Sequence, residues 1–167
     1  MSSILDVADY IVKKYKEYSN ETLDEMKLHK LLYFTQRETL ALTGHPAFPE
    51  EFEGWKYGPT SPKVRHTYVD GEIFAPVKNV PDELKYIVNN VILEYGAIAS
   101  WKLSELSHRE ISWLNSRKGL ASNEPGNRKL QLSDIMEDAK KIRPYDHVWD
   151  MYYDEFDDYD ENEGDVP

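Results

Sequence analysis

The amino-acid sequence predicts a mainly α-helical fold: one compact helical domain with at most a small β element, followed by an acidic C-terminal tail. Three observations predict this class. Apolar residues recur mostly at the spacing of amphipathic helices, and few stretches alternate as strands do. Several apolar stretches begin or end at residues typical of helix caps. The length of 167 residues fits one domain whose core is large enough to need no disulfides.

The N-terminal part of the chain is predicted to form two helices. Residues 3–18 carry apolar side chains at helical spacing on one side, which indicates an amphipathic helix. Thr22 and Glu25 have the spacing of a capping box, so we expect a second helix to begin there and to end at Gly44. Because this second helix has apolar residues on more than one face, we expect it to lie at the centre of the domain.

Residues 45–62 concentrate prolines and glycines, which predicts a structured loop with a short strand at 52–55. Ser61 followed by Pro62 is typical of an N-cap and a first helical position, so a short helix through Tyr68 is expected.

Further along the chain, Asp70-Gly71 predicts a turn and residues 72–77 a short strand. Pro81 begins a helix with one apolar side, which ends at Gly96. Residues 100–106 are predicted to form a short helix.

Two more helices complete the prediction. Ser107 and Glu110 form a second capping box, which indicates a helix that runs to about Arg117. Ser133 is expected to cap a last short helix that extends to about Ile142.

The acidic residues are concentrated at the C-terminus. Nine of the 31 Asp and Glu residues follow His147 and no Lys or Arg does, so residues 1–149 hold 22 acids against 20 bases. We therefore divide the chain into a helical domain, residues 1–145, and a tail, residues 146–167. A nearly neutral domain lacks the surplus of Lys and Arg that a dedicated nucleic-acid binder needs.

The tail interleaves acids with aromatic side chains. Those predicted to bind a partner are Trp149, Tyr152, Tyr153 and Phe156. One interpretation is a solvated, flexible end. The other is an acidic strip with hydrophobic anchors, which suits the basic groove of a protein partner or the lysines of this chain's own domain.

Several classes of function are not expected. The chain has no cysteine, no apolar run long enough to cross a membrane and no secretory signal, so a cytoplasmic protein is expected. Its five histidines lie far apart, and neither a phosphate-binding glycine motif nor a G-x-S-x-G elbow occurs. We therefore expect no metal, no cofactor, no catalytic residue and no enzymatic activity. The distant alternative is a hydrolase that uses His108 and Glu110.

Two short stretches remain open to both a structural and a binding role. Trp55 and Tyr57 precede Gly58-Pro59, and they are either core anchors beside a turn or preformed interface residues. His108 and Arg109 either occupy a well-capped helix start or are presented to a partner.

Three stretches together resemble the signature blocks of the Panacea-domain family. They are "MKLHKLLYFTQRETLALTGHPAF", "EFEGWKYGPTSPKVRHTY" and "LSELSHREISWLNSR", in this order and spacing. The positions that match are Lys27, Leu28, Lys30, Leu31, Leu32, Tyr33 and Gln36, then Trp55, Tyr57, Gly58, Pro59, Pro62 and Val64, then Leu106, His108, Glu110 and Trp113. The likeness extends from about Leu5 to Ile142.

The resemblance implies an antitoxin from a bacterial or phage toxin–antitoxin system, which neutralises a toxin encoded by a neighbouring gene through direct protein contact. The alternative that it implies is an adaptor that delivers its partner to the unfoldase of a ClpXP-type protease. In either role the partner-binding residues of the domain would be Lys30, Tyr33, Gln36, Trp55, Tyr57, His108, Arg109 and Trp113. Gly58, Pro59, Pro62 and Glu110 would have a structural role.

Overall fold

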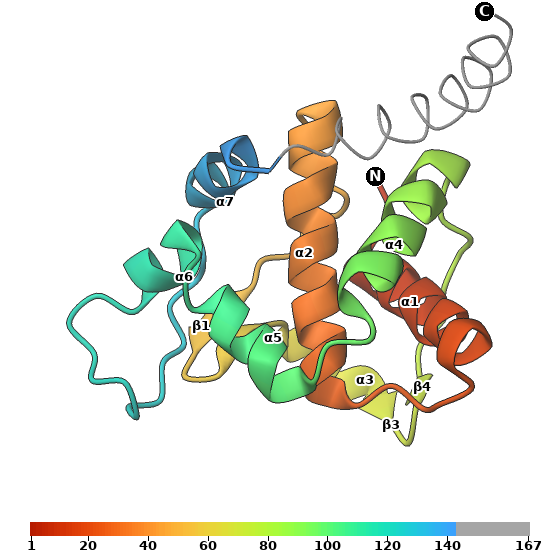
Figure 1. Cartoon of the computed structure of the whole chain (residues 1–167), viewed down its shortest axis with the longest axis horizontal. Coiled ribbons are helices and arrows are strands. Elements are labelled where there is room, and N and C mark those ends of the chain that lie inside the picture. The colour runs from red at the N-terminus through yellow and green to blue at the C-terminus, as the bar shows by residue number, and fades with distance from the viewer. Residues whose placement is uncertain (143–167) are drawn as a thin grey trace, which may run out of the picture.

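The computed structural model describes residues 1–142, so the four tail aromatics predicted to bind a partner lie outside the described residues. The described part is mainly helical, as predicted, with two small antiparallel strand pairs (Figure 1). Its elements are α1 (Ile4–Ser19), α2 (Glu25–Thr43), β1 (Glu53–Trp55), β2 (Gly58–Thr60), α3 (Pro62–Thr67), β3 (Tyr68–Val69), β4 (Glu72–Ile73), α4 (Asp82–Tyr95), α5 (Ser100–Ser107), α6 (Ile111–Ser116) and α7 (Leu132–Lys140).

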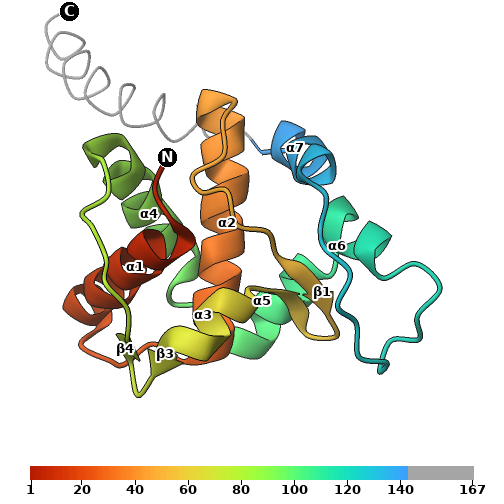
Figure 2. The same cartoon turned by 180° about the vertical axis from the view of Figure 1, so that it is seen from behind.

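Helix α2 is the central element, which confirms the expectation from its apolar pattern. It packs against α1 and α4 on one side and against α5, α7 and β2 on the other (Figures 1 and 2). Every side chain from Lys27 to Leu40 is buried, including several charged ones. Because buried polar groups need partners, α2 determines where the polar contacts of the neighbouring elements must lie.

The caps of the first two helices differ in part from the prediction. Helix α1 starts with a capping box of Ser3 and Asp6, which the sequence analysis did not identify. The capping box predicted at Thr22 is wrong, because Asp24 is the N-cap of α2 and its carboxylate accepts from the Lys27 amide at 2.9 Å. Helix α2 ends at Gly44 with a left-handed φ of 77°, as predicted.

The loop after α2 is held by Gln36. Its side-chain amide donates to the carbonyl of Phe48 at 3.0 Å and accepts from the amide of Ala47 at 2.7 Å. Phe48 and Phe52 from this loop pack edge to face in the core, and Phe52 packs likewise on Tyr33 of α2. The loop is therefore built into the core.

The strand predicted at 52–55 forms as β1 and pairs with β2 in a tight hairpin, with Trp55 opposite Gly58. Ser61 caps α3 as predicted, accepting from the Val64 amide at 3.2 Å with proline at the helix start. The strand expected over 72–77 is shorter, because the pairing of β3 with β4 ends at Ile73.

Two caps predicted in the second half of the chain are also wrong. Ser107 does not cap a helix: it is the last residue of α5, where its hydroxyl donates to the carbonyl of Ser104 at 2.7 Å. Ser133 is not a cap either, because α7 begins one residue before it, at Leu132.

The cap predicted at the start of α6 is replaced by a tertiary one. The carboxylate of Asp138 on α7 accepts from the amides of Ile111 and Ser112 at 2.7 and 2.9 Å. Glu110, the other half of the predicted box, instead forms an ion pair with Arg37 of α2. Helix α6 is thus joined to both α7 and α2.

Candidate functional site

The tip of the β1–β2 hairpin is held by side chains that donate to its backbone carbonyls. From α6, the indole of Trp113 donates to the carbonyl of Trp55 at 2.7 Å. From α5, the hydroxyl of Ser104 donates to the carbonyl of Tyr57 at 2.6 Å. These bonds connect the third sequence block to the second and fix the backbone on either side of Lys56.

Two buried cations hold the strands of the same hairpin. Lys30 of α2 donates to the carbonyl of Pro59 at 3.0 Å, and Arg117 donates to the carbonyl of Gly54 at 3.1 Å. Both cations are at least nine-tenths buried. All three sequence blocks therefore meet at the hairpin, although they are far apart in the sequence.

Gly58 is required at the hairpin for two reasons. Its φ of 116° is one that side-chain-bearing residues rarely adopt. In addition, a Cβ at this position would lie 2.7 Å from Cε of Lys30 and would overlap the hydroxyl of Ser107. The close approach of backbone to α2 and α5 thus explains the glycine of the motif.

The held tip leaves aromatic surface exposed. Tyr57 is 56% exposed, Trp55 is partly buried and Lys56 is exposed. The Trp55 indole donates to Glu53 at 2.9 Å, while the guanidinium of Arg65 lies 5.2 Å from the Trp55 ring centre. This surface is preformed, since its backbone is held by other elements.

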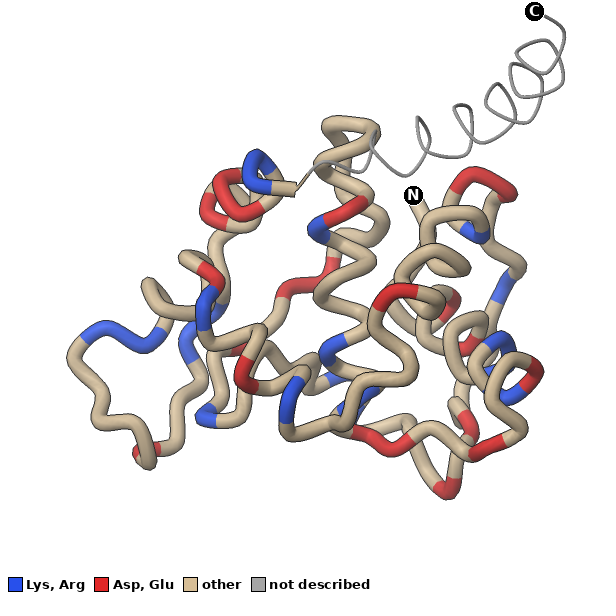
Figure 3. Tube along the Cα trace, viewed as in Figure 1, with Lys and Arg blue, Asp and Glu red and all other residues tan. Residues whose placement is uncertain are grey.

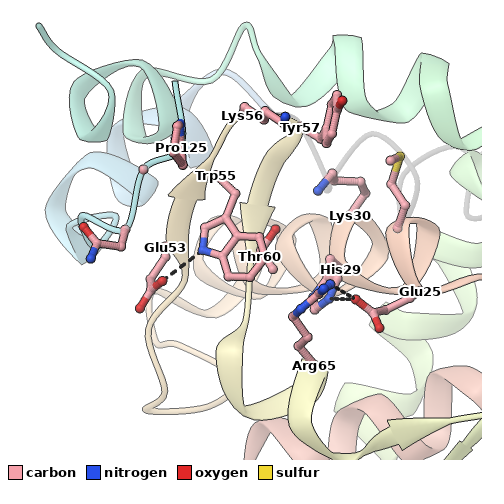
Figure 4. A pocket seen from close by; sticks show the side chains of 13 residues that line it. Glu25, His29, Lys30, Glu53, Trp55, Lys56, Tyr57, Thr60, Arg65 and Pro125 are labelled. Atoms are coloured by element: carbon pink, nitrogen blue, oxygen red, sulfur yellow. Dashed lines mark hydrogen bonds and ion pairs between the residues drawn. The ribbon is translucent and has the colours of Figure 1, made fainter. Parts of the chain in front are cut away.

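Beside the tip lies a pocket of about 510 Å³ between α2, the hairpin, α3 and the loop that precedes α7 (Figure 4). Its lining residues are Glu25, Met26, His29, Lys30, Glu53, Trp55, Lys56, Tyr57, Thr60, Arg65, Pro125, Gly126 and Asn127. This size is in the range of small-ligand sites in proteins.

One wall of the pocket is an ordered chain of polar contacts. Nδ1 of His29 accepts from the Ser61 amide at 3.2 Å, so the proton of the neutral ring is on Nε2, which faces Glu25 at 3.3 Å. Burial lowers the pKa of His29, and the bond from His29 together with the charge of Arg65 lowers the pKa of Glu25. Arg65 bonds the same Glu25 oxygen at 2.9 Å, so this oxygen has two partners.

Lys30 is the most deeply buried charged residue of the pocket lining. Its side chain is only 1% exposed, and burial lowers its pKa to about 7. Among residues 1–142, no carboxylate forms an ion pair with it. The ammonium form is therefore short of a counter-charge.

His108 and Arg109, which were also predicted to bind a partner, differ in their exposure to solvent. His108 stacks on Trp113 with ring centres 4.1 Å apart, and its Nε2 is buried without a hydrogen-bond partner in the described part of the chain. Burial lowers the pKa of His108. Arg109 is exposed.

Four of the predicted binding residues are buried, namely Lys30, Tyr33, Gln36 and Trp113, and two of them hold the interior of the domain together. The hydroxyl of Tyr33 lies in a buried network with Ser112 and Asp138, at 2.8 and 2.9 Å. Gln36 is 3% exposed and holds the loop after α2. Neither side chain is accessible to a partner in this structure, because both satisfy buried polar groups of the domain itself.

Glu25, His29 and Arg65 line the pocket, although no sequence motif pointed to them as site residues. The i, i+4 spacing of Glu25 and His29 on a predicted helix was the available signal. Arg65 comes from α3, and nothing local indicates that it reaches α2.

Lys and Arg residues are interspersed with Asp and Glu residues along the described chain (Figure 3). None of the helices between residues 1 and 142 is long and apolar enough to cross a bilayer. In the same part of the chain, no three His, Asp or Glu side chains are arranged to hold a metal ion.

The fold and the site define a small helical domain that presents a rigid aromatic hairpin beside a pocket. The family profile described as "Antitoxin SocA-like, Panacea domain" matches residues 28–114, just over half of the chain. The chain therefore belongs to this family, as its three sequence blocks predicted. No curated protein and no solved structure matches the chain.

Proposed function

We propose that this protein is the antitoxin of a bacterial or phage toxin–antitoxin system. It binds a toxin encoded by a neighbouring gene and neutralises it in the cytoplasm by direct protein contact, without catalysing a reaction. The membership of the SocA-like antitoxin family supports this proposal, since residues 28–114 contain the hairpin and three of the side chains that hold it, Lys30, Ser104 and Trp113.

The observation that carries the proposal is the preformed hairpin tip. Tyr57 is exposed, but its own carbonyl and that of Trp55 accept hydrogen bonds from other elements. An aromatic side chain on a held backbone loses little conformational entropy when it binds, and aromatic residues dominate the energy of protein interfaces. We therefore place the centre of the toxin-binding surface at Trp55, Lys56 and Tyr57.

A single substitution tests this placement. The chain is co-expressed with the product of the neighbouring gene, and rescue of growth is measured together with the Kd of the two purified proteins. Replacing a central aromatic anchor costs about 2 kcal/mol, which corresponds to about 30-fold in Kd, so Tyr57→Ala should lose most of the rescue.

Tyr18→Ala is the matched control, because Tyr18 is 52% exposed and lies at the end of α1, away from the hairpin. It should rescue growth like the wild type. If the neighbouring product is harmless by itself, or if the wild-type chain fails to rescue growth, the antitoxin role is wrong. If Tyr57→Ala rescues fully, the binding surface lies elsewhere.

The second candidate is an adaptor that delivers its partner to a ClpXP-type protease, which the SocA-like description of the family favours. The two roles differ in the fate of the partner. An adaptor shortens the half-life of the partner only in cells that contain the protease, whereas a purely steric antitoxin leaves the half-life unchanged.

A further inference from the structure

The pocket beside the hairpin contains a buried cation, and neither carboxylate of its lining forms an ion pair with that cation. Of the two acids in the lining, Glu25 is already bonded to His29 and Arg65. Glu53 accepts from the indole of Trp55. Lys30 has one hydrogen bond to the protein, to the carbonyl of Pro59. An ammonium group can donate three, so Lys30 has donor capacity that no residue of the described part of the chain uses, and it forms part of the pocket wall.

An unpaired buried charge is costly, and proteins normally pair or neutralise it. Burial lowers the pKa of Lys30, which reflects the cost of keeping its charge in the interior. The charges that act on Lys30 from neighbouring elements include those of His29 and His108, whose own pKa values are lowered by burial and by Lys30. An imidazole is neutral or cationic, so neither ring supplies the negative charge that would pair with Lys30. The negative charges of the lining are those of Glu25 and Glu53, and neither forms an ion pair with Lys30 among residues 1–142.

The rest of the pocket restricts what the anion can be attached to. Trp55 and Tyr57 provide aromatic surface, and Figure 4 shows Lys30 between these rings and α2. Lys56 and Arg65 add positive charge beside the same rings. The lining thus suits a carboxylate that is carried on, or next to, an aromatic or aliphatic group.

We propose that this pocket receives an acidic side chain of the protein partner, with its carboxylate at Lys30 and a neighbouring apolar group against Trp55. This inference rests on the proposed function, because it names the chemistry that the partner presents to the hairpin surface. The pocket and the exposed tip share Trp55, Lys56 and Tyr57, so a protein bound to the tip also covers the pocket.

The test uses a pair of small probes with the full-length protein. The probes are 3-phenylpropionate and 3-phenylpropionamide, which have the same shape and differ in charge. Binding is followed by NMR through the indole N–H signal of Trp55. The carboxylate should shift this signal saturably, and the amide should bind at least tenfold more weakly. Equal binding of the two probes, or no shift of the Trp55 signal, would overturn the proposal.

Lys30→Met removes the charge but keeps most of the side-chain volume. Lys27→Met is the matched control. Lys27 is also a buried lysine of α2, and it donates to the carbonyl of Gly96 at 2.8 Å. It lies outside the pocket lining. The affinity for 3-phenylpropionate should fall at least tenfold in Lys30→Met and should be unchanged in Lys27→Met. An equal loss in both variants contradicts a specific role of Lys30. The comparison of acid with amide on the wild-type chain decides the question even if Lys30→Met does not fold.

The same measurements separate this inference from the proposed function. If the chain rescues growth but does not distinguish acid from amide, the pocket proposal fails and the antitoxin role stands. If the acid binds at Lys30 but no partner is neutralised, a carboxylate site exists and the proposal that a protein partner occupies it is wrong.

Discussion

Replacing Asp138 by asparagine should test whether the tertiary cap of α6 is an important source of stability. One oxygen of the carboxylate accepts from the Ile111 amide at 2.7 Å, and the other accepts from the Ser112 amide and the Tyr33 hydroxyl, both at 2.9 Å. Asp138 is 1% exposed. In Asp138→Asn, the oxygen that faces Ser112 and Tyr33 becomes an NH₂ group, which cannot accept from the Ser112 amide.

The size of the effect follows from these contacts. A hydrogen bond to a charged group contributes about 1.5–3 kcal/mol, and an unsatisfied buried donor costs about 1–3 kcal/mol. Because Tyr33 can reorient towards Ser112, we expect a net loss of about 3 kcal/mol in the free energy of unfolding. For a domain of this size that loss lowers Tm by about 6–12 °C.

The assay is urea and thermal unfolding followed by circular dichroism. Glu137→Gln is the control, since Glu137 is an exposed neighbour on α7 whose surface ion pair with Lys140 should contribute under about 1 kcal/mol. A loss in Asp138→Asn no larger than in Glu137→Gln would refute the assignment of Asp138 as the cap of α6. Because α6 carries the Trp113 bond to the hairpin, the variant should also bind the partner more weakly.

Two further predictions concern α2 and the hairpin. Burial and the nearby charge of Glu94 raise the pKa of Glu38 to about 8. Between pH 4.5 and 8 the unfolded chain therefore releases a proton that the folded chain keeps, so the contribution of Glu38 to the free energy of unfolding falls as pH rises. Glu38→Gln removes the titrating group, so the free energy of unfolding of the variant minus that of the wild type should increase by on the order of 3 kcal/mol from about pH 5 to about pH 8. Unfolding of both proteins at the two pH values measures this, and a pH-independent difference contradicts it. Gly58→Ala should lose about 3 kcal/mol through backbone strain and overlap, whereas Gly44→Ala, also at positive φ but with nothing within 4 Å, should lose about 1 kcal/mol. Equal Tm values for the two alanine variants would show that close packing at Gly58 is not the reason for the glycine.

The elements that the sequence predicted well are those with strong local chemistry. Helix α2 is recognisable from its apolar residues and from Gly44, and α3 from Ser61 and Pro62. The hairpin region was recognisable because proline and glycine restrict the backbone whatever surrounds them. These features act over a few residues, so no tertiary contact is needed to identify them.

Helix caps were predicted less well, because several side chains can accept from the free amides at the start of a helix. Thr22, Ser107 and Ser133 all have the residue type of a cap, yet none of them caps a helix. Asp24 bonds the α2 amide instead, and Asp138 reaches α6 from another helix. A buried carboxylate that accepts from two amides outcompetes a neutral hydroxyl nearby.

The candidate site was predicted only in part for a similar reason. The sequence pointed to Trp55 and Tyr57, which lie at the exposed tip. It also pointed to Tyr33 and Gln36, which share the motif with Lys30 but are buried on other faces of α2. A linear motif does not distinguish residues that face a surface from those that face the core when the whole helix is enclosed.

By itself, the sequence determined the helical class, the family and the acidic end of this protein. These depend on composition and on local spacing, which are properties of neighbouring residues. Only the tertiary structure decided that Lys30 lines the same pocket as Trp55 without an ion pair among residues 1–142, and that His29 and Arg65 both bond Glu25. It also decided that the hairpin is held by α2, α5 and α6. The physical reason is that burial and charge pairing depend on which elements pack together, and the contacts responsible join residues up to about 60 positions apart.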